Sequence, residues 1–229
     1  MKKYIKRTLK KSIEQASKSF KVILLTGPRQ VGKTTLLKEI SKENRSYVTL
    51  DDQNLRIAAQ KDPAMFIDRL ELPVLIDEVQ YAPELFSSIK MAVDNSDKTG
   101  IFWLTGSQQF EMMENITESL AGRVGVFKLQ GLSLEEEEDY PSDGPFLPTV
   151  ELLKKRRAGR KKGLGVKEIY KKIWRGSFPD VVINKGKVWE RFYESYVTTY
   201  IQKDIRDHLG IADEAVFRRF MEVAAARTG

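Results

Sequence analysis

One glycine-rich segment constrains the fold of this chain more than any other part of the sequence. The eight residues from Gly27 to Thr34 read Gly-Pro-Arg-Gln-Val-Gly-Lys-Thr, which fits the pattern of a glycine, four residues, then Gly-Lys-Ser/Thr. The apolar run 22–26 before them predicts a buried parallel strand, and residues 35–40 after them predict the first turns of a helix. Strand, glycine loop and helix in that order form a phosphate-binding loop, in which backbone N–H groups and the positive helix end hold a polyphosphate.

We therefore expect the chain to bind a nucleoside triphosphate, with ATP as the nucleotide and Mg²⁺ as the metal. Lys33 would reach the β- and γ-phosphates, and the Thr34 hydroxyl would be a ligand of Mg²⁺. Segment 184–187 resembles the guanine-reading motif Asn-Lys-x-Asp but lacks its aspartate, which argues against GTP. The expected nucleotide-binding residues are Gly27, Pro28, Arg29, Gln30, Val31, Gly32, Lys33, Thr34 and Thr35.

The composition is that of a soluble protein and excludes several kinds of site. Of the 229 residues, 41% are apolar and 31% are charged, and no apolar run approaches the roughly 18 residues that cross a bilayer. Because the chain contains no cysteine, disulfides, thiolate zinc sites and a cysteine nucleophile are excluded. His208 stands among charged residues and is expected on a solvated helix rather than as a catalytic base. These features predict a cytoplasmic protein without a membrane segment.

The net charge of +7 is unevenly distributed along the chain. Residues 1–21 carry eight Lys/Arg and one Glu, and residues 149–175 carry eleven Lys/Arg and two Glu. The body from 22 to 148 is acidic, with twelve basic and twenty-one acidic residues. Basic segments of this kind bind DNA in some proteins and are solvated helix faces or linkers in others. Because aromatic residues are sparse in them, we favour the second interpretation.

Strands and helices alternate along most of the chain, which predicts an α/β fold with a five-stranded parallel sheet sandwiched between helices. An acidic run and a Pro/Gly-rich stretch together mark a boundary at 135–148. We therefore predict an ATPase domain over 1–133, an acidic then basic linker over 134–165, and a helical lid or start of a C-terminal domain over 166–229. Within the linker, 154–165 is expected to be a flexible loop, with a short helix over 149–156 as the alternative. The expected strands are 22–26, 46–50, 73–76, 101–105 and 124–129, and the expected helices are 4–17, 33–41, 53–70, 83–93 and 107–121.

Two carboxylates end the short apolar strand 73–76. Asp77 is suited to hold Mg²⁺ through water, opposite Thr34. Glu78 is the candidate general base that orients and deprotonates an attacking water. The Asp-Glu pair alone is a weak signal, but it becomes specific when it follows a phosphate-binding loop with one strand between.

Strand 101–105 carries a third candidate for the site. It should lie between the phosphate-loop strand and the Asp77 strand, and so present a polar side chain to the γ-phosphate and the attacking water. Ser107 is the better candidate and Thr105 the alternative. Ser107 is equally suited to cap the helix that follows, and it can do both.

Arg123 stands between the expected helix 107–121 and the last strand. An arginine there can extend across a subunit interface as a finger that stabilises charge on a neighbour's γ-phosphate. It can also act within its own subunit, or pair with a helix C-terminus. The sequence leaves these three roles open.

The order of these motifs resembles a family of archaeal and bacterial AAA-type ATPases in which the AAA domain is followed by a C-terminal domain of unknown function. The extra strand before the Asp-Glu pair is typical of AAA+ ATPases, whereas a transporter ATPase has its Ser-Gly-Gly-Gln signature before that pair. By this resemblance, Lys33, Thr34, Asp77 and Glu78 carry the nucleotide, metal and hydrolysis roles. The matching blocks are 27–36, 50–52, 76–80, 104–108, 119–123, 176–179 and 200–205.

The resemblance implies a Mg²⁺-dependent ATPase that drives an unidentified DNA- or protein-directed process. Two alternatives stay open: a slow nucleotide-gated switch for a C-terminal effector or DNA-binding domain, and an ATP-modulated nucleic-acid binder. The expected partners are ATP, DNA through the basic segments or a missing C-terminal region, and further copies of the chain with Arg123 acting in trans. Members of the family continue well past the point where this chain stops, so we expect it to be C-terminally truncated.

Overall fold

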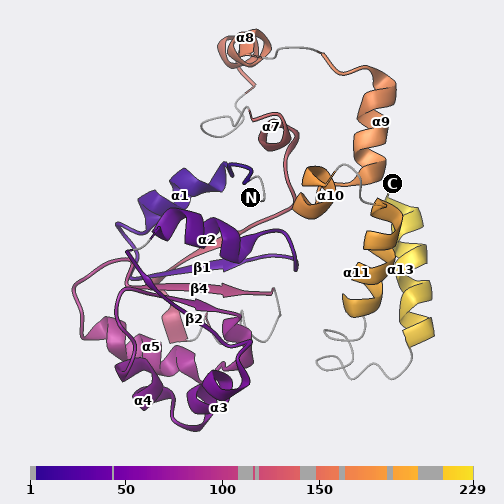
Figure 1. The fold of residues 1–229 in the computed structure, drawn as a ribbon. Coiled ribbons are helices and arrows are strands. Elements are labelled where there is room, and N and C mark those ends of the chain that lie inside the picture. The colour runs from indigo at the N-terminus through magenta and orange to yellow at the C-terminus, as the bar shows by residue number, and fades with distance from the viewer. Residues whose placement is uncertain are drawn as a thin grey trace. The chain divides into compact units, whose positions relative to one another are not determined.

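A five-stranded parallel sheet organises the larger part of the chain. The computed structural model describes residues 4–42, 44–107, 116, 119–139, 148–159, 163–184, 188–200 and 214–228. The chain forms two compact units, Met1–Val182 and Ile183–Gly229, and the sheet belongs to the first (Figure 1). Its strand order is β2-β3-β4-β1-β5. The predicted α/β fold is therefore confirmed. The strands are β1 (Val22–Thr26), β2 (Ser46–Thr49), β3 (Val74–Asp77), β4 (Phe102–Gly106) and β5 (Val124–Lys128).

Helices cover both faces of this sheet (Figure 1). Side chains of β1 alternate between the two layers: Val22 and Leu24 join the core under one set of helices, and Ile23 and Leu25 join the core under the other. All four are fully buried, and burying a side chain of this size contributes about 1.5–3 kcal/mol. One face carries α1 (Leu9–Ala16) and α2 (Lys33–Ser41), and the other carries α3 (Gln53–Lys61), α4 (Pro63–Asp68) and α5 (Leu85–Asp94).

The position of β4 is the feature that builds a site. β4 pairs in parallel with β1 on one side and with β3 on the other, so Leu104 lies between Leu24 and Ile76. This confirms the predicted placement of strand 101–105. The carboxyl ends of parallel strands share one edge of a sheet, where ligands bind in open α/β folds. The phosphate loop, the Asp77-Glu78 pair and Ser107 therefore come together.

The predicted single helix over 53–70 is wrong, because the chain makes two helices there. α3 ends at Lys61, and α4 begins at Pro63. Proline has no N–H to continue a helix but suits its first position. Asp62 caps the second helix, with its side chain accepting a hydrogen bond from the backbone N–H of Met65 at 2.9 Å.

The prediction of a flexible loop from residue 154 is also wrong. Helix α8 (Val150–Gly159) runs through the first half of that segment, which favours the alternative of a short helix and extends it. Lysine, arginine and leucine are good helix formers, so the basic composition itself supports this helix. The predicted helix 107–121 lies mostly outside the described residues.

Further helices follow the sheet. α7 (Leu134–Glu137), α9 (Val166–Arg175) and α10 (Pro179–Ile183) come first, then α11 (Trp189–Tyr200) and α13 (Glu214–Thr228) in the second unit. The helical stretch that begins at 166 is interrupted over 176–178, since α9 ends at Arg175 and α10 begins at Pro179. The domain bounds predicted at 133/134 and 165/166 stay a prediction.

Candidate nucleotide-binding site

The phosphate loop follows β1 and takes a backbone path that requires glycine at its start. Gly27 has φ 141°, and a Cβ added there would lie 2.1 Å from the carbonyl oxygen of Leu129, so any side chain would collide with the backbone after β5. Gln30 and Gly32 also have positive φ, at 61° and 93°. Beside Gly32 the space is open, with no atom within 4 Å of an added Cβ. The loop thus packs tightly against the fold at one end and leaves room at the start of α2.

Lys33 and Thr34 form the first turn of α2. The Lys33 side chain is buried, and its Nζ donates to the carbonyls of Gly27 and Pro28 at 3.0 Å each. This lysine therefore arches back over its own loop, where it would meet the phosphates of a nucleotide. Thr35, Arg29 and the remaining loop residues stay predicted nucleotide-binding residues.

Asp77, the last residue of β3, gathers three hydroxyl groups. The Thr34 Oγ1 lies 2.8 Å from Asp77 Oδ1 and 3.0 Å from Oδ2. The Tyr47 Oη donates to Oδ2 at 3.0 Å from the neighbouring strand, and the Thr105 hydroxyl donates to Oδ1 from the other side. Burial and, second, the Asp77 carboxylate raise the pKa of Tyr47 to about 12, so its phenol remains a donor at neutral pH.

A hydroxyl and a carboxylate at this spacing fit Mg²⁺, which prefers oxygen ligands and keeps several waters and substrate phosphates in its shell. In the described part of the chain, no three His, Cys, Asp or Glu side chains converge as a metal cluster. Thr34 and Asp77 are the residues that would hold Mg²⁺, with water and nucleotide completing its shell.

Glu78 follows Asp77 in a left-handed backbone conformation, with φ 58° and ψ 45°. That conformation is uncommon for residues other than glycine and clusters at functional sites. Its N–H donates to Thr105 Oγ1 at 3.2 Å, and its carboxylate accepts a hydrogen bond from the Gln80 side chain. Glu78 is thus held beside the Asp77 carboxylate by two contacts, which suits a base that must keep one position.

Ser107 and Thr105 are the two candidates that the sequence offers for a polar group facing the γ-phosphate, and their hydroxyl groups make different contacts. Thr105 is fully buried and bridges Asp77 and the Glu78 N–H, so its hydroxyl is already used within the site. The Ser107 Oγ is buried and has no hydrogen-bond partner among the described residues. A buried hydroxyl without a partner is costly, and a phosphate oxygen or water would satisfy it. The residues that Ser107 would cap lie outside the described part.

Arg123 lies away from the other candidates. It directly precedes β5, and its carbonyl accepts a hydrogen bond from the N–H of Val22. Val22 is at the amino end of β1, whereas the phosphate loop follows the carboxyl end of that strand. A five-residue strand spans roughly 16 Å, so the geometry does not support a role for Arg123 at the nucleotide of its own subunit. Its guanidinium pairs with Asp94, with Nη2 3.0 Å from Oδ2, and donates to the Ala121 carbonyl at 3.0 Å. This contact lowers the pKa of Asp94.

Two residues of the site were not predicted. Tyr47 gives no signal in the sequence, because a tyrosine in a strand is ordinary and only the pairing of β2 with β3 brings it to Asp77. Gln80 follows the acidic pair by two residues, and its role depends on the tight turn of the 3₁₀ helix η1 (Val79–Tyr81).

Strand order, loop geometry and the Thr34–Asp77 contact together define a P-loop nucleoside triphosphatase fold. Residues 19–137 match the AAA domain family, and this chain belongs to that family of P-loop ATPases. Residues 166–229 match a second family, a domain of unknown function (DUF8612).

Several known proteins are similar to this chain. The uncharacterized proteins Rv2008c of Mycobacterium tuberculosis and Mb2031c of Mycobacterium bovis are each 35% identical over 127 residues, covering 55% of this chain and 29% of theirs. This chain therefore matches less than a third of the length of those relatives. The Walker-type ATPase PABY2304 of Pyrococcus abyssi has 15% identity and a TM-score of 0.49, over 98% of this chain and 77% of that one. A RuvB mutant of Thermotoga maritima has 20% identity and a TM-score of 0.41, over 59% and 49%. Among the described helices of this chain, none has the length and apolar character needed to cross a membrane.

Proposed function

We propose that the chain binds ATP with Mg²⁺ and hydrolyses it to ADP and phosphate. The observation that carries the proposal is the 2.8 Å contact between Thr34 Oγ1 and Asp77 Oδ1, at the open end of the phosphate loop. It brings the two expected protein ligands of Mg²⁺ to one point, beside the lysine that would bind the phosphates. When bound, Mg²⁺ neutralises charge on the β- and γ-phosphates.

Each residue then has a distinct task. Lys33 would exchange its loop carbonyls for phosphate oxygens and stabilise their negative charge. Glu78 would accept a proton from the water that attacks the γ-phosphorus. The Ser107 hydroxyl, which has no partner among the described residues, would donate to the γ-phosphate or the attacking water.

We expect Lys33→Ala to weaken ATP binding by at least tenfold, on the order expected for one lost hydrogen bond to a charged group. ATP affinity can be measured by calorimetry on the full chain with and without Mg²⁺. Lys61→Ala is the matched control, because it removes an exposed lysine from α3 on the other face of the sheet. Equal ATP affinity in wild type and Lys33→Ala would contradict the proposed site.

We further propose that ATP hydrolysis serves a process on DNA, because the basic helices α8 and α9 expose side chains that can bind it. Lys154, Lys155 and Arg157 of α8 are exposed, and α9 exposes Tyr170 and Trp174 at 68% and 76%. Exposed cations bind a phosphate backbone, and exposed aromatic rings stack on bases. The sequence suggested that aromatic residues were too sparse for this role, but helix α9 presents two of them to solvent.

We expect DNA to stimulate ATP turnover several-fold, with a stimulation that falls steeply between low and moderate salt. The measurement is the ATPase rate with and without DNA at two salt concentrations. Lys154→Gln with Lys155→Gln should lose the stimulation and keep the basal rate. A slow rate that DNA does not change would instead support a nucleotide-gated switch, and salt-sensitive DNA binding that ignores ATP would support a nucleic-acid binder.

A further inference from the structure

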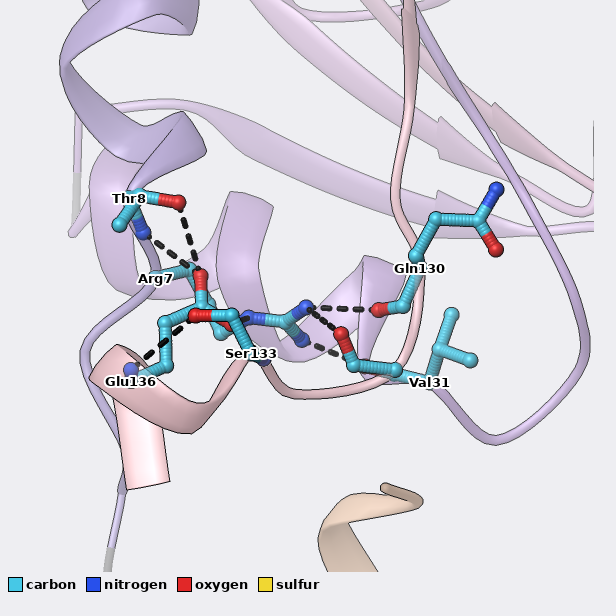
Figure 2. A network of polar contacts seen from close by, with 7 residues as sticks. Arg7, Thr8, Val31, Gln130, Ser133 and Glu136 are labelled. Carbon is cyan, nitrogen blue, oxygen red and sulfur yellow. Dashed lines mark hydrogen bonds and ion pairs between the residues drawn. The ribbon is translucent and has the colours of Figure 1, made fainter. Parts of the chain in front are cut away.

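A buried arginine outside the predicted site holds the phosphate loop. Arg7 lies before α1 and is only 7% exposed, yet its guanidinium has four acceptors within hydrogen-bond distance (Figure 2). The Nε donates to Glu136 Oε2 at 3.1 Å, and Nη1 donates to the carbonyl of Val31 at 2.8 Å. The Nη2 donates to the carbonyls of Gln130 at 2.6 Å and Gly131 at 3.2 Å. Three distant segments of the chain therefore meet at one side chain.

The Val31 carbonyl is the important acceptor. Val31 stands in the phosphate loop between Gln30 and Gly32, both of which have positive φ. In a trans peptide the C=O and the next N–H point in opposite directions. A hydrogen bond that fixes the Val31 carbonyl toward Arg7 therefore fixes the Gly32 N–H in the opposite direction, away from Arg7. An N–H at that point of the loop is one of the donors that a polyphosphate requires.

Glu136 keeps the guanidinium in place. Its carboxylate is 4% exposed and accepts from the Thr8 N–H at 2.8 Å, the Thr8 hydroxyl at 3.0 Å and the Ser133 N–H at 3.0 Å, besides Arg7 (Figure 2). A buried charge is tolerated only when it is paired and hydrogen-bonded. The pair meets that condition and so has one defined geometry.

We propose that Arg7 is a positioning residue of the nucleotide site, which presets the peptide between Val31 and Gly32 for phosphate binding. The expected effect of Arg7 on ATP affinity rests on the proposed ATP binding. Its expected effect on the conformation of the phosphate loop does not. Removing the contact should leave the loop free to rotate this peptide, so ATP would have to order it on binding.

Arg7→Lys is the test variant, because it keeps the positive charge but cannot reach four acceptors in a fork. Arg45→Lys is the matched control. The Arg45 guanidinium also donates to backbone carbonyls, but at the amino end of the strands, away from the phosphate loop. Its acceptors are the carbonyls of Val74, Ile101 and Gly100. Both variants should lower thermal stability, so stability alone does not distinguish them.

ATP affinity and loop exchange do distinguish them. We expect Arg7→Lys to raise the Kd and KM for ATP about tenfold or more, with kcat at saturating ATP changed less than twofold. Amide exchange of Gly32 without nucleotide should accelerate by a similar factor. Arg45→Lys should change neither. If Arg7→Lys does not fold, Glu136→Gln should show the same direction of change with a smaller size.

Unchanged ATP affinity and unchanged Gly32 exchange in Arg7→Lys would overturn the proposal, as would an equal loss of affinity in Arg45→Lys. If the wild-type chain binds no ATP, the proposed function fails, and Gly32 exchange alone decides the role of Arg7. Faster exchange there then supports the proposal, and unchanged exchange rejects it.

Discussion

Glu78→Gln is expected to lower ATP turnover by about 10²–10⁴-fold, the range that general base catalysis contributes. Glutamine has nearly the shape of glutamate but cannot accept a proton from water. The backbone position should survive, because the Glu78 N–H rather than its side chain bonds to Thr105. ATP affinity should therefore stay close to that of the wild type, and the loss should appear in kcat.

Single-turnover hydrolysis and equilibrium ATP binding on the same preparation separate these two quantities. Glu84→Gln is the control, because it changes the same residue type in the following turn, where Glu84 precedes α5. Unchanged hydrolysis in Glu78→Gln would show that another residue is the general base. A parallel loss of ATP affinity would show that the variant disturbs the phosphate loop instead.

The sequence predicts which residues lie together at the centre of the candidate site, because that placement follows from local pattern. Lys33 and Thr34 are adjacent in one motif, and Asp77 and Glu78 end one strand. The rule that parallel strands share a carboxyl edge then brings the two pairs together, and the 2.8 Å contact from Thr34 to Asp77 agrees with that expectation.

The parts that were missed depend on contacts between distant segments. Arg7 and Glu136 are 129 positions apart, and the sequence around either residue does not predict that the other is its partner. An N-terminal arginine in a basic segment is expected on the surface, so its burial could not be read from composition. Tyr47 is similar, since only the register of β2 against β3 brings it to Asp77.

The break between α3 and α4 is different, because the sequence contained its signal. Aspartate followed by proline is a helix N-cap followed by a favoured first residue. The prediction of one helix over 53–70 did not use that local signal. In the structure a new helix begins at Pro63, because a proline inside a helix removes a backbone hydrogen bond and its ring clashes with the preceding turn.

Arg123→Ala is expected to lower ATP turnover on the order of 10³-fold, the lower range for an arginine finger, while ATP binding stays unchanged. Arg123 lies at the amino end of the parallel strands, and the phosphate loop lies at their carboxyl end, so the nucleotide of its own subunit is out of reach. We therefore propose that Arg123 acts on the nucleotide of a neighbouring subunit. In the isolated chain Asp94 holds the guanidinium, and this ion pair would have to open when a neighbouring subunit brings its phosphates. Asp94→Asn should therefore not reduce turnover as Arg123→Ala does.

A mixing experiment tests the trans role directly. Glu78→Gln chains lack the base but keep the finger, and Arg123→Ala chains lack the finger but keep the base. If the finger acts between subunits, mixing the two inactive variants creates interfaces in which an intact Glu78 faces an intact Arg123, and part of the activity returns. If Arg123 only secures its own fold through Asp94, no mixture recovers activity, and the Arg123→Ala loss should follow a loss of thermal stability instead.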